Sequence, residues 1–256
     1  MSTMTMRGRL SSFAWRASSA AIFATVGLAT ISTNPIAAQG KHAKPAVAKT
    51  IKTTVLKPTP VKATTAKPMV TSSQNWELAN ISNARVDTWV ARFEHSISST
   101  LARGRTYMDM ISQKLEARKM PQELVYLPMI ESNFNPVARS NASAVGLWQF
   151  VASTARHFGL NVGNGADERR DPAKETDAAL SYLSQLHDRF QSWYLAAAAY
   201  NAGPGTVSKA LRKVTGRTTG TDEDFYRISS ALPAETRDYV PKLIAAARVA
   251  KANNHS

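Results

Sequence analysis

The segment Trp193-Tyr194-Leu195-Ala196-Ala197-Ala198-Ala199-Tyr200-Asn201-Ala202-Gly203 is apolar at almost every position, and it decides the fold class. A helix that is apolar all round has no face suited to water, so other elements must surround it. Gly203 is a favourable residue for ending such a helix. We therefore expect this segment to be the central buried helix of a helical domain.

The segments before and after it also have helical periodicity, with apolar residues three and four positions apart. Asp171-Pro172 is a favourable helix start. Pro121 starts a helix that runs to Glu131, and Pro128 is expected to kink it. No alternating run indicates strands, so the sequence predicts a compact all-α domain of about seven to nine helices. The expected apolar faces are Val86, Trp89, Val90 and Phe93; Tyr107, Met110, Ile111 and Leu115; Ala179, Tyr182, Leu183, Leu186 and Phe190; and Tyr239, Val240, Leu243, Ile244 and Ala247, in a last helix beginning near Pro233.

The charge distribution separates the N-terminal part of the chain from this domain. The 256 residues carry a net charge of +14, and residues 1–75 contain ten Lys and Arg residues but no Asp or Glu. Residues 1–38 have a basic start, a short apolar stretch and small residues near Ala38, which is the pattern of a secretory signal peptide. The stretch is too short for a membrane span. We expect export to the periplasm, cleavage, and a mature protein without a membrane span.

Residues 39–75 are rich in Lys, Pro and Thr and have no apolar period. Such a segment cannot bury enough surface to fold, so we interpret it as a disordered basic linker. It is either a solvated spacer or an electrostatic tether to an anionic polymer. We expect no nucleic-acid partner, because the linker lacks interleaved aromatic residues and export removes the chain from the cytoplasm. Residues 76–256 then form the helical domain.

Glu131 is the candidate catalytic residue, since it follows the apolar segment Leu127-Pro128-Met129-Ile130 and a turn lies directly behind it. Apolar surroundings remove the hydration that the carboxylate needs, so the pKa of Glu131 is expected to rise toward neutral pH. A carboxyl group of this kind is suited to general acid catalysis. A solvated helix-end Glu is the alternative interpretation of this residue taken alone.

Three more unusual segments follow in order and favour the catalytic interpretation. Together with Glu131-Ser132-x-Phe134-x-Pro136, they resemble the motifs of the soluble and membrane-bound D-type lytic transglycosylases, which have a goose-type-lysozyme-like (SLT) fold. The resemblance covers about residues 80–250, with an SLT core at about 115–250. The three segments are Gly146-Leu147-Trp148-Gln149-Phe150, Ala199-Tyr200-Asn201-Ala202-Gly203, and Leu232-Pro233-x-Glu235-Thr236-x-x-Tyr239-Val240.

The resemblance implies cleavage of the β-1,4 bond between N-acetylmuramic acid and N-acetylglucosamine in peptidoglycan glycan strands, with formation of 1,6-anhydromuramic acid. Glu131 would act first as general acid and then as base. The resemblance implies substrate binding for Ser140, Gln149, Tyr200 and Asn201, and supporting roles for Ser132 and Glu235. Trp148 and Phe150 are interpreted as core residues rather than as the lining of the sugar cleft.

Two alternatives stay open at this stage, a lysozyme-like hydrolase and a non-catalytic peptidoglycan-binding protein. We expect no cofactor and no metal site, because the chain has no cysteine and its histidines lack the spacing of metal ligands. We expect a monomer. D-type relatives often carry a lipid-attachment cysteine or LysM repeats, and this sequence has neither.

Overall fold

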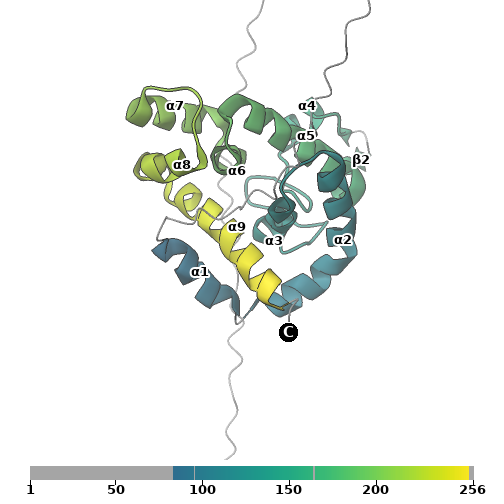
Figure 1. Ribbon diagram of the computed structural model, residues 1–256. Helices are drawn as coiled ribbons and strands as arrows, with labels where there is room; N and C mark the ends of the chain where they lie inside the picture. The colour runs from purple at the N-terminus through teal and green to yellow at the C-terminus, as the bar shows by residue number, and fades with distance from the viewer. Residues whose placement is uncertain (1–82, 95, 164, 254–256) are drawn as a thin grey trace, which may run out of the picture. The chain divides into compact units, whose positions relative to one another are not determined.

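Helix α6 (Trp193–Ala202) lies at the centre of the computed structural model, which describes residues 83–94, 96–163 and 165–253 (Figure 1). Residues 194–199 of this helix are completely buried. Its first turn is capped by Ser192, whose Oγ accepts a hydrogen bond from the backbone N–H of Leu195 at 3.1 Å. It ends at Gly203, which has a φ of 81°. The expectation of a central buried helix is confirmed.

Helix α5 (Pro172–Phe190) packs against α6 and starts as the sequence predicts. The Asp171 carboxylate accepts hydrogen bonds from the backbone N–H groups of Ala173 and Lys174, at 3.0 and 3.1 Å. Most of the expected apolar face is buried, whereas Tyr182 is only partly buried. Tyr182 instead packs against the ring of Tyr200, with 5.4 Å between the ring centroids.

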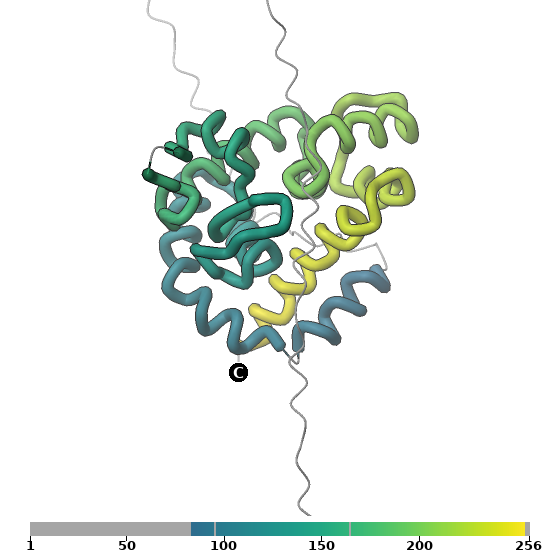
Figure 2. The backbone as a smooth tube through the Cα atoms, turned by 180° about the vertical axis from the view of Figure 1, so that it is seen from behind, coloured from purple at the N-terminus to yellow at the C-terminus, as the bar shows by residue number. Residues whose placement is uncertain are grey.

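Helices α1 (Ala84–Glu94), α2 (Ile97–Ala117) and α9 (Ala234–Asn253) enclose the other side of the domain. Figures 1 and 2 show α1 lying beside α9 from both directions. Pro241 lies inside α9, yet the helix continues past it to Asn253. The expected kink at Pro128 takes another form. The chain changes from a 3₁₀-helix, η1 (Gln122–Tyr126), to α3 (Leu127–Ser132). Pro128 therefore lies in the first turn of α3, where the backbone N–H that proline lacks would have no partner within the helix.

The remaining elements complete a fold of nine α-helices among the described residues. A hairpin of two-residue strands, with Val162 opposite Asp167, is the only sheet in this part of the chain, so the all-α prediction is confirmed. Trp148 and Phe150 are buried, as the core interpretation predicts. The expected signal peptide (1–38) and linker (39–75) lie outside the described residues. The other elements are α4 (Ala152–His157), β1 (Val162–Gly163), β2 (Ala166–Asp167), η2 (Glu168–Arg170), α7 (Pro204–Thr215), α8 (Asp222–Ile228) and η3 (Ser229–Ala231).

Candidate active site

Glu131 lies at the end of α3, and only 8% of its surface is exposed. The helix stops directly behind it because Asn133 and Phe134 both adopt the left-handed backbone conformation, with φ values of 54° and 56°. The buried Phe134 ring packs directly on Gly104 of α2, where an added Cβ would lie 2.5 Å from the ring. This contact fixes the turn against α2 and thereby fixes the position of Glu131.

The pKa of Glu131 is raised from its ordinary value to about 7, and burial is the main cause. Three neighbours on α9 modify it. A hydrogen bond from Tyr239 lowers the pKa, the negative charge of Glu235 raises it, and the positive charge of Lys242 lowers it. At neutral pH the protonated and ionised forms therefore both exist in large fractions. The expected rise of the pKa is confirmed.

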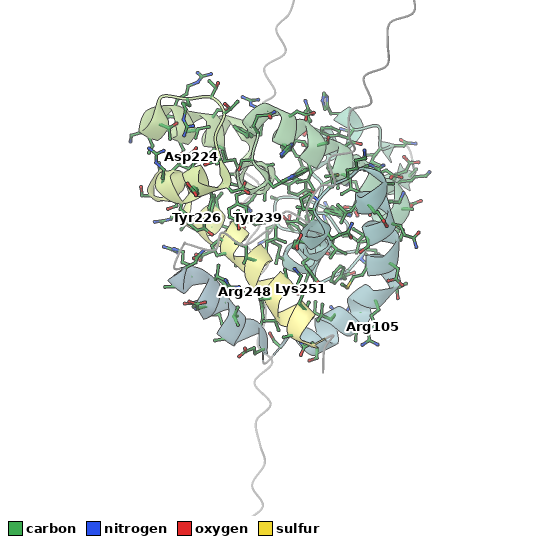
Figure 3. The ribbon with its side chains drawn as sticks, in the orientation of Figure 1. Arg105, Asp224, Tyr226, Tyr239, Arg248 and Lys251 are labelled. Atoms are coloured by element: carbon green, nitrogen blue, oxygen red, sulfur yellow. The ribbon has the colours of Figure 1, made fainter. Side chains whose placement is uncertain are left out.

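Tyr239 is the direct partner of Glu131, and it is buried in the middle of α9 (Figure 3). Its hydroxyl donates a hydrogen bond to Glu131 Oε1. Burial and the neighbouring Glu131 both raise the pKa of this phenol well above its ordinary value, so it stays a donor. The bond fixes one carboxyl oxygen, which leaves Oε2 for other partners.

Ser132 joins α3 to the loop that carries the second motif. Its Oγ lies 2.9 Å from the carbonyl oxygen of Leu147, to which it donates, and it accepts a hydrogen bond from the backbone N–H of Asn135 at 3.2 Å. The carbonyl oxygen of Pro128 lies 3.1 Å from the same Oγ. Ser132 thus holds the loop of residues 138–150, here called the motif loop, next to Glu131.

Buried polar groups hold the motif loop from its other side. The completely buried Glu175 of α5 accepts hydrogen bonds from the backbone N–H groups of Leu147 and Trp148, at 2.7 and 3.0 Å. Arg169 donates to the carbonyl oxygens of Ser143 and Phe150, at 3.1 and 3.0 Å. Together these two side chains satisfy backbone groups in the middle and at the C-terminal end of the loop.

Gly146 is required where the motif loop approaches Glu175. Its φ is +96°, and an added Cβ would lie 2.0 Å from the carbonyl oxygen of Arg169 and 2.3 Å from Glu175 Oε1. A side chain here would collide with backbone as well as adopt a strained conformation. Only glycine fits at this position without movement of the loop.

Gln149 lies in the motif loop, with a φ of 54°, and not in a helix. Its amide nitrogen donates to the carbonyl oxygen of Gly146 at 2.8 Å. That bond fixes the orientation of the Gln149 amide group and leaves its oxygen, Oε1, available as an acceptor. Ser140, at the other end of the loop, is buried, and its Oγ accepts a hydrogen bond from the backbone N–H of Ala144 at 3.1 Å.

Tyr200 and Asn201 come from the C-terminal end of α6 and bond to the protein itself. The Tyr200 hydroxyl donates to the carbonyl oxygen of Trp148 at 2.8 Å. Asn201 Oδ1 accepts a hydrogen bond from the Thr236 hydroxyl at 2.8 Å, and its Nδ2 lies 3.5 Å from Glu235 Oε1. These bonds connect α6 to the motif loop and to α9, and so bring the candidate residues of all four motifs into one region.

The chain resembles known proteins in sequence and in fold. Residues 109–222 match the family described as Transglycosylase SLT domain. The chain is similar to that family over this segment, which is just under half of its length. Its structure has a lysozyme-like fold, and it resembles the solved complex of the 70-kDa soluble lytic transglycosylase with bulgecin A. The TM-score is 0.50 at 24% identity, over 66% of this chain and 29% of that one.

Curated relatives of the chain include membrane-bound lytic murein transglycosylase D of Escherichia coli K12, which is 43% identical over 150 residues. That alignment covers 58% of this chain and 32% of the relative. The soluble lytic murein transglycosylase of the same organism is 30% identical over 146 residues, which cover 54% of this chain and 22% of the relative. The chain therefore spans about a third or less of the length of these two relatives.

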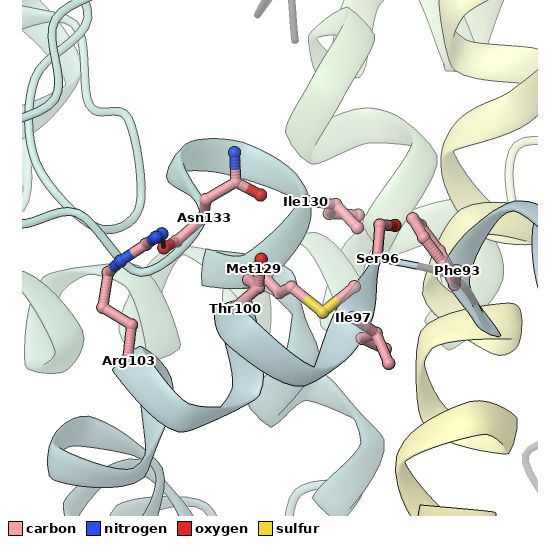
Figure 4. A pocket seen from close by; sticks show the side chains of 8 residues that line it. All are labelled: Phe93, Ser96, Ile97, Thr100, Arg103, Met129, Ile130 and Asn133. Carbon is pink, nitrogen blue, oxygen red and sulfur yellow. Dashed lines mark hydrogen bonds between the residues drawn. The ribbon is translucent and has the colours of Figure 1, made fainter. Parts of the chain in front are cut away.

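A cavity of about 160 Å³ lies beside α3, on the side that faces α1 and α2 (Figure 4). Ile130 and Asn133, which lie close to Glu131 in sequence, line it together with Arg103, whose Nη1 donates to the carbonyl oxygen of Asn133 at 2.8 Å. None of the predicted site residues lines this cavity. It adjoins the candidate site rather than containing it.

Sequence reasoning missed three residues that organise the candidate site. Tyr239 belongs to the fourth motif, which is a sequence signal for a residue of the site, but the sequence analysis assigned no role to it. Glu175 stands in the first turn of a helix, where an acidic residue is common for other reasons. Arg169 stands in the charged segment Asp167-Glu168-Arg169-Arg170-Asp171-Pro172, which also resembles the D-type transglycosylases, but no role was assigned to it. In addition, the described residues contain no cluster suited to a metal ion and no helix long and apolar enough to cross a membrane.

Proposed function

We propose that this chain is a peptidoglycan lytic transglycosylase. It would cleave the β-1,4 bond between N-acetylmuramic acid and N-acetylglucosamine and form 1,6-anhydromuramic acid. One observation carries the proposal, namely a buried Glu131 with a pKa of about 7 and one oxygen fixed by Tyr239. The names of the relatives that align with this chain, both murein transglycosylases, support the choice of substrate.

In the first step, protonated Glu131 gives its proton to the glycosidic oxygen, and the bond from that oxygen to C1 of the muramic acid breaks. Tyr239 occupies Oε1, so the proton is carried by Oε2. General acid catalysis of this kind contributes roughly 10²–10⁴-fold in rate. The negative charge that develops on Glu131 is stabilised by the Tyr239 hydroxyl and by the positive charge of Lys242.

In the second step, the Glu131 carboxylate takes the proton from the C6 hydroxyl of the same sugar while that oxygen attacks C1. The proton lost in the first step is thereby recovered, and no water enters the product. A group that must give and then take a proton works best with a pKa near the working pH. The pKa of about 7 meets this requirement without a second carboxylate.

The other predicted residues would bind the sugar around this centre. The free oxygen of the Gln149 amide is placed to accept a hydrogen bond, and the Ser140 hydroxyl retains its hydrogen to donate one. The Tyr200 hydroxyl donates to the protein but its oxygen can still accept a bond. Asn201 and Glu235 would keep this wall in position, and Ser132 would keep the motif loop next to Glu131.

The proposal is tested by digesting purified sacculi with the protein and with Glu131→Gln and weighing the products. We expect 1,6-anhydro muropeptides from the wild type, and at least ~10²-fold less product from the variant. Reducing-end sugars alone would instead indicate a lysozyme-like hydrolase. Binding of glycan without any turnover by the wild type would indicate a non-catalytic protein.

The same variant has a second expected property that reports on folding. Because the folded pKa of Glu131 is raised to about 7, the folded state holds an extra proton below that pH, and stability declines as pH rises from about 4.5 to 7. Glu131→Gln removes this decline and is expected to be more stable than the wild type at pH 8, by up to about 3 kcal/mol. If the variant lost activity because it unfolds, urea denaturation at pH 8 would instead show a lower free energy of unfolding than that of the wild type.

We also propose that the enzyme acts in the periplasm after export through residues 1–38. The basic, apolar and small-residue pattern of that segment supports export. Cell fractionation followed by sequencing of the mature N-terminus tests it. A chain that keeps Met1 and stays in the cytoplasm would contradict the proposal.

A further inference from the structure

Helix α7, with the two residues that follow it, contains the whole excess positive charge of the folded region. Ten of the 32 Lys and Arg residues lie in residues 1–75, and all 18 acidic residues lie in residues 76–256, which leaves that region with +4. Residues 204–217 hold four cations and no acidic residue. Outside this segment, the basic and acidic residues of 76–256 balance. The four cations are Lys209, Arg212, Lys213 and Arg217.

Three of these side chains form one exposed cluster, which we call the basic face of α7. Lys209, Arg212 and Lys213 are three and four positions apart and point away from the buried side of the helix. None of the three has an ion pair or a side-chain hydrogen bond within the described residues. Arg217, by contrast, is bound to the buried Asp224 at 2.6 Å.

The helix itself does not explain this concentration of charge. Cations in the last turn interact favourably with the helix dipole, which accounts for Arg212 and Lys213 in part. Lys209 lies earlier in the helix, and like charges four residues apart repel each other. Several cations elsewhere in the domain do have carboxylate partners, as when Asp177 binds both Lys114 and Arg118 at 2.7 and 2.8 Å.

The basic face begins close to the candidate site. Helix α6 ends with Tyr200 and Asn201, which belong to the candidate site, and the single residue Gly203 connects it to α7. Figure 1 shows α7 at the edge of the domain, next to α8. A polymer bound at the site would reach α7 if it extended past the C-terminal end of α6.

We propose that Lys209, Arg212 and Lys213 form a second contact with peptidoglycan, by binding the free carboxylates of its stem peptides. This inference rests on the proposed function for the identity of the polymer. Several cations on one face attract a polymer with repeated carboxylates, and the attraction is weakened by salt. A lipid surface fits less well, because membrane-surface helices need an apolar face and Val214 is the only large apolar side chain exposed on α7.

The test compares two double variants with equal loss of charge, both made in the full chain with Glu131→Gln so that binding is measured without turnover. Arg212→Gln/Lys213→Gln removes part of the basic face. Arg105→Gln/Lys119→Gln is the matched control, because these two cations are exposed and have no ion pair within the described residues. Arg105 lies on α2, across the view from α7 (Figure 3).

Binding of each variant is measured by co-sedimentation with purified sacculi at low salt. We expect about tenfold weaker binding for the α7 variant and less than about twofold for the control, with the difference disappearing as salt rises. Sacculi whose carboxylates have been amidated should bind all variants equally weakly. Circular dichroism melts show that each variant is folded.

Three results would overturn the inference: equal binding by the two double variants, undiminished binding to amidated sacculi, or α7-dependent binding to phosphatidylglycerol vesicles with none to sacculi. Failure of the proposed function is seen separately. It would appear as the absence of anhydro products from the chain with Glu131 intact, whatever the sedimentation result.

Discussion

The candidate site has two sides, which different interactions hold in place. The helical wall consists of Glu131 and Tyr239, and the loop wall consists of the motif loop with Gln149. Glu131 and Tyr239 stand on helices α3 and α9, whose apolar faces are buried in the core. Gln149 stands in the motif loop, which depends on hydrogen bonds from Arg169 and to Glu175. Apolar burial is non-directional and tolerates small shifts, whereas a buried polar network needs every partner in place. Substitutions in the loop wall should therefore lower the free energy of unfolding of the protein. Substitutions in the helical wall should mainly change the pKa of Glu131.

Gly146→Ala is expected to have the largest effect on stability, because it adds a methyl group where the motif loop packs most tightly. The added methyl group collides with the Arg169 carbonyl oxygen, and the φ of +96° strains any residue other than glycine. We expect a loss of about 3–4 kcal/mol in the free energy of unfolding, measured in urea. Gly205→Ala is the control, since its site is open, and it should be neutral or slightly stabilising. Similar losses in both variants would contradict the idea that the loop wall is special.

Glu175→Gln tests the same wall with a smaller change. The two oxygens of Glu175 accept two backbone N–H groups, while glutamine offers one oxygen and turns an NH₂ group toward the other donor. We expect a loss of about 2 kcal/mol in unfolding free energy. Glu116→Gln, at an exposed position of α2, should change stability by less than about 0.5 kcal/mol. An unchanged Glu175→Gln protein would show that the loop does not depend on this carboxyl group.

Tyr239→Phe tests the helical wall, where we expect a change of titration with the fold retained. The Tyr239 hydrogen bond lowers the pKa of Glu131, so its removal raises that pKa above about 7. Glu131 then stays protonated to higher pH, and the alkaline limb of kcat/KM should move upward by about one unit. Tyr226→Phe removes a phenol bonded to Asn83 and should leave the profile unchanged. A shift toward lower pH would contradict the proposed role of Tyr239.

Lys242→Met should produce the smallest effect, in the same direction. Lys242 lowers the pKa of Glu131 by its charge alone, and it is partly exposed. Its ammonium group lies 4.5 Å from the centre of the Trp89 ring of α1, which holds it in position. We expect the alkaline limb to rise by less than about one unit, and the difference from wild type to shrink at high salt. If the shift persisted unchanged in high salt, loss of packing rather than loss of charge would be its cause.

The sequence predicts the helical wall better than the loop wall, for a physical reason. Apolar periodicity repeats along the chain, so the buried helix Trp193–Ala202 and the raised pKa of Glu131 follow from local patterns. A hydrogen bond between Glu175 and Leu147 joins residues 28 positions apart and leaves no periodic trace. Gln149 has a positive φ without being glycine, so the turn there has no signal in the sequence either. The Tyr239–Glu131 bond spans 108 positions and needs the complete fold.

The packing of α1 along α9 bears on how this unit is inherited and exchanged between genes. The family match ends at residue 222, so a segment copied at its borders would include Glu131 and omit Tyr239. Arg85 of α1 bonds to Asp238 of α9 at 2.6 Å, and Arg248 of α9 reaches Asp87 at 3.3 Å. The two ends of the domain thus close on each other, an arrangement that suits insertion into longer proteins. A copied segment would therefore keep the Glu131–Tyr239 hydrogen bond only if it included α9, and it would keep the two ion pairs between α1 and α9 only if it included both helices.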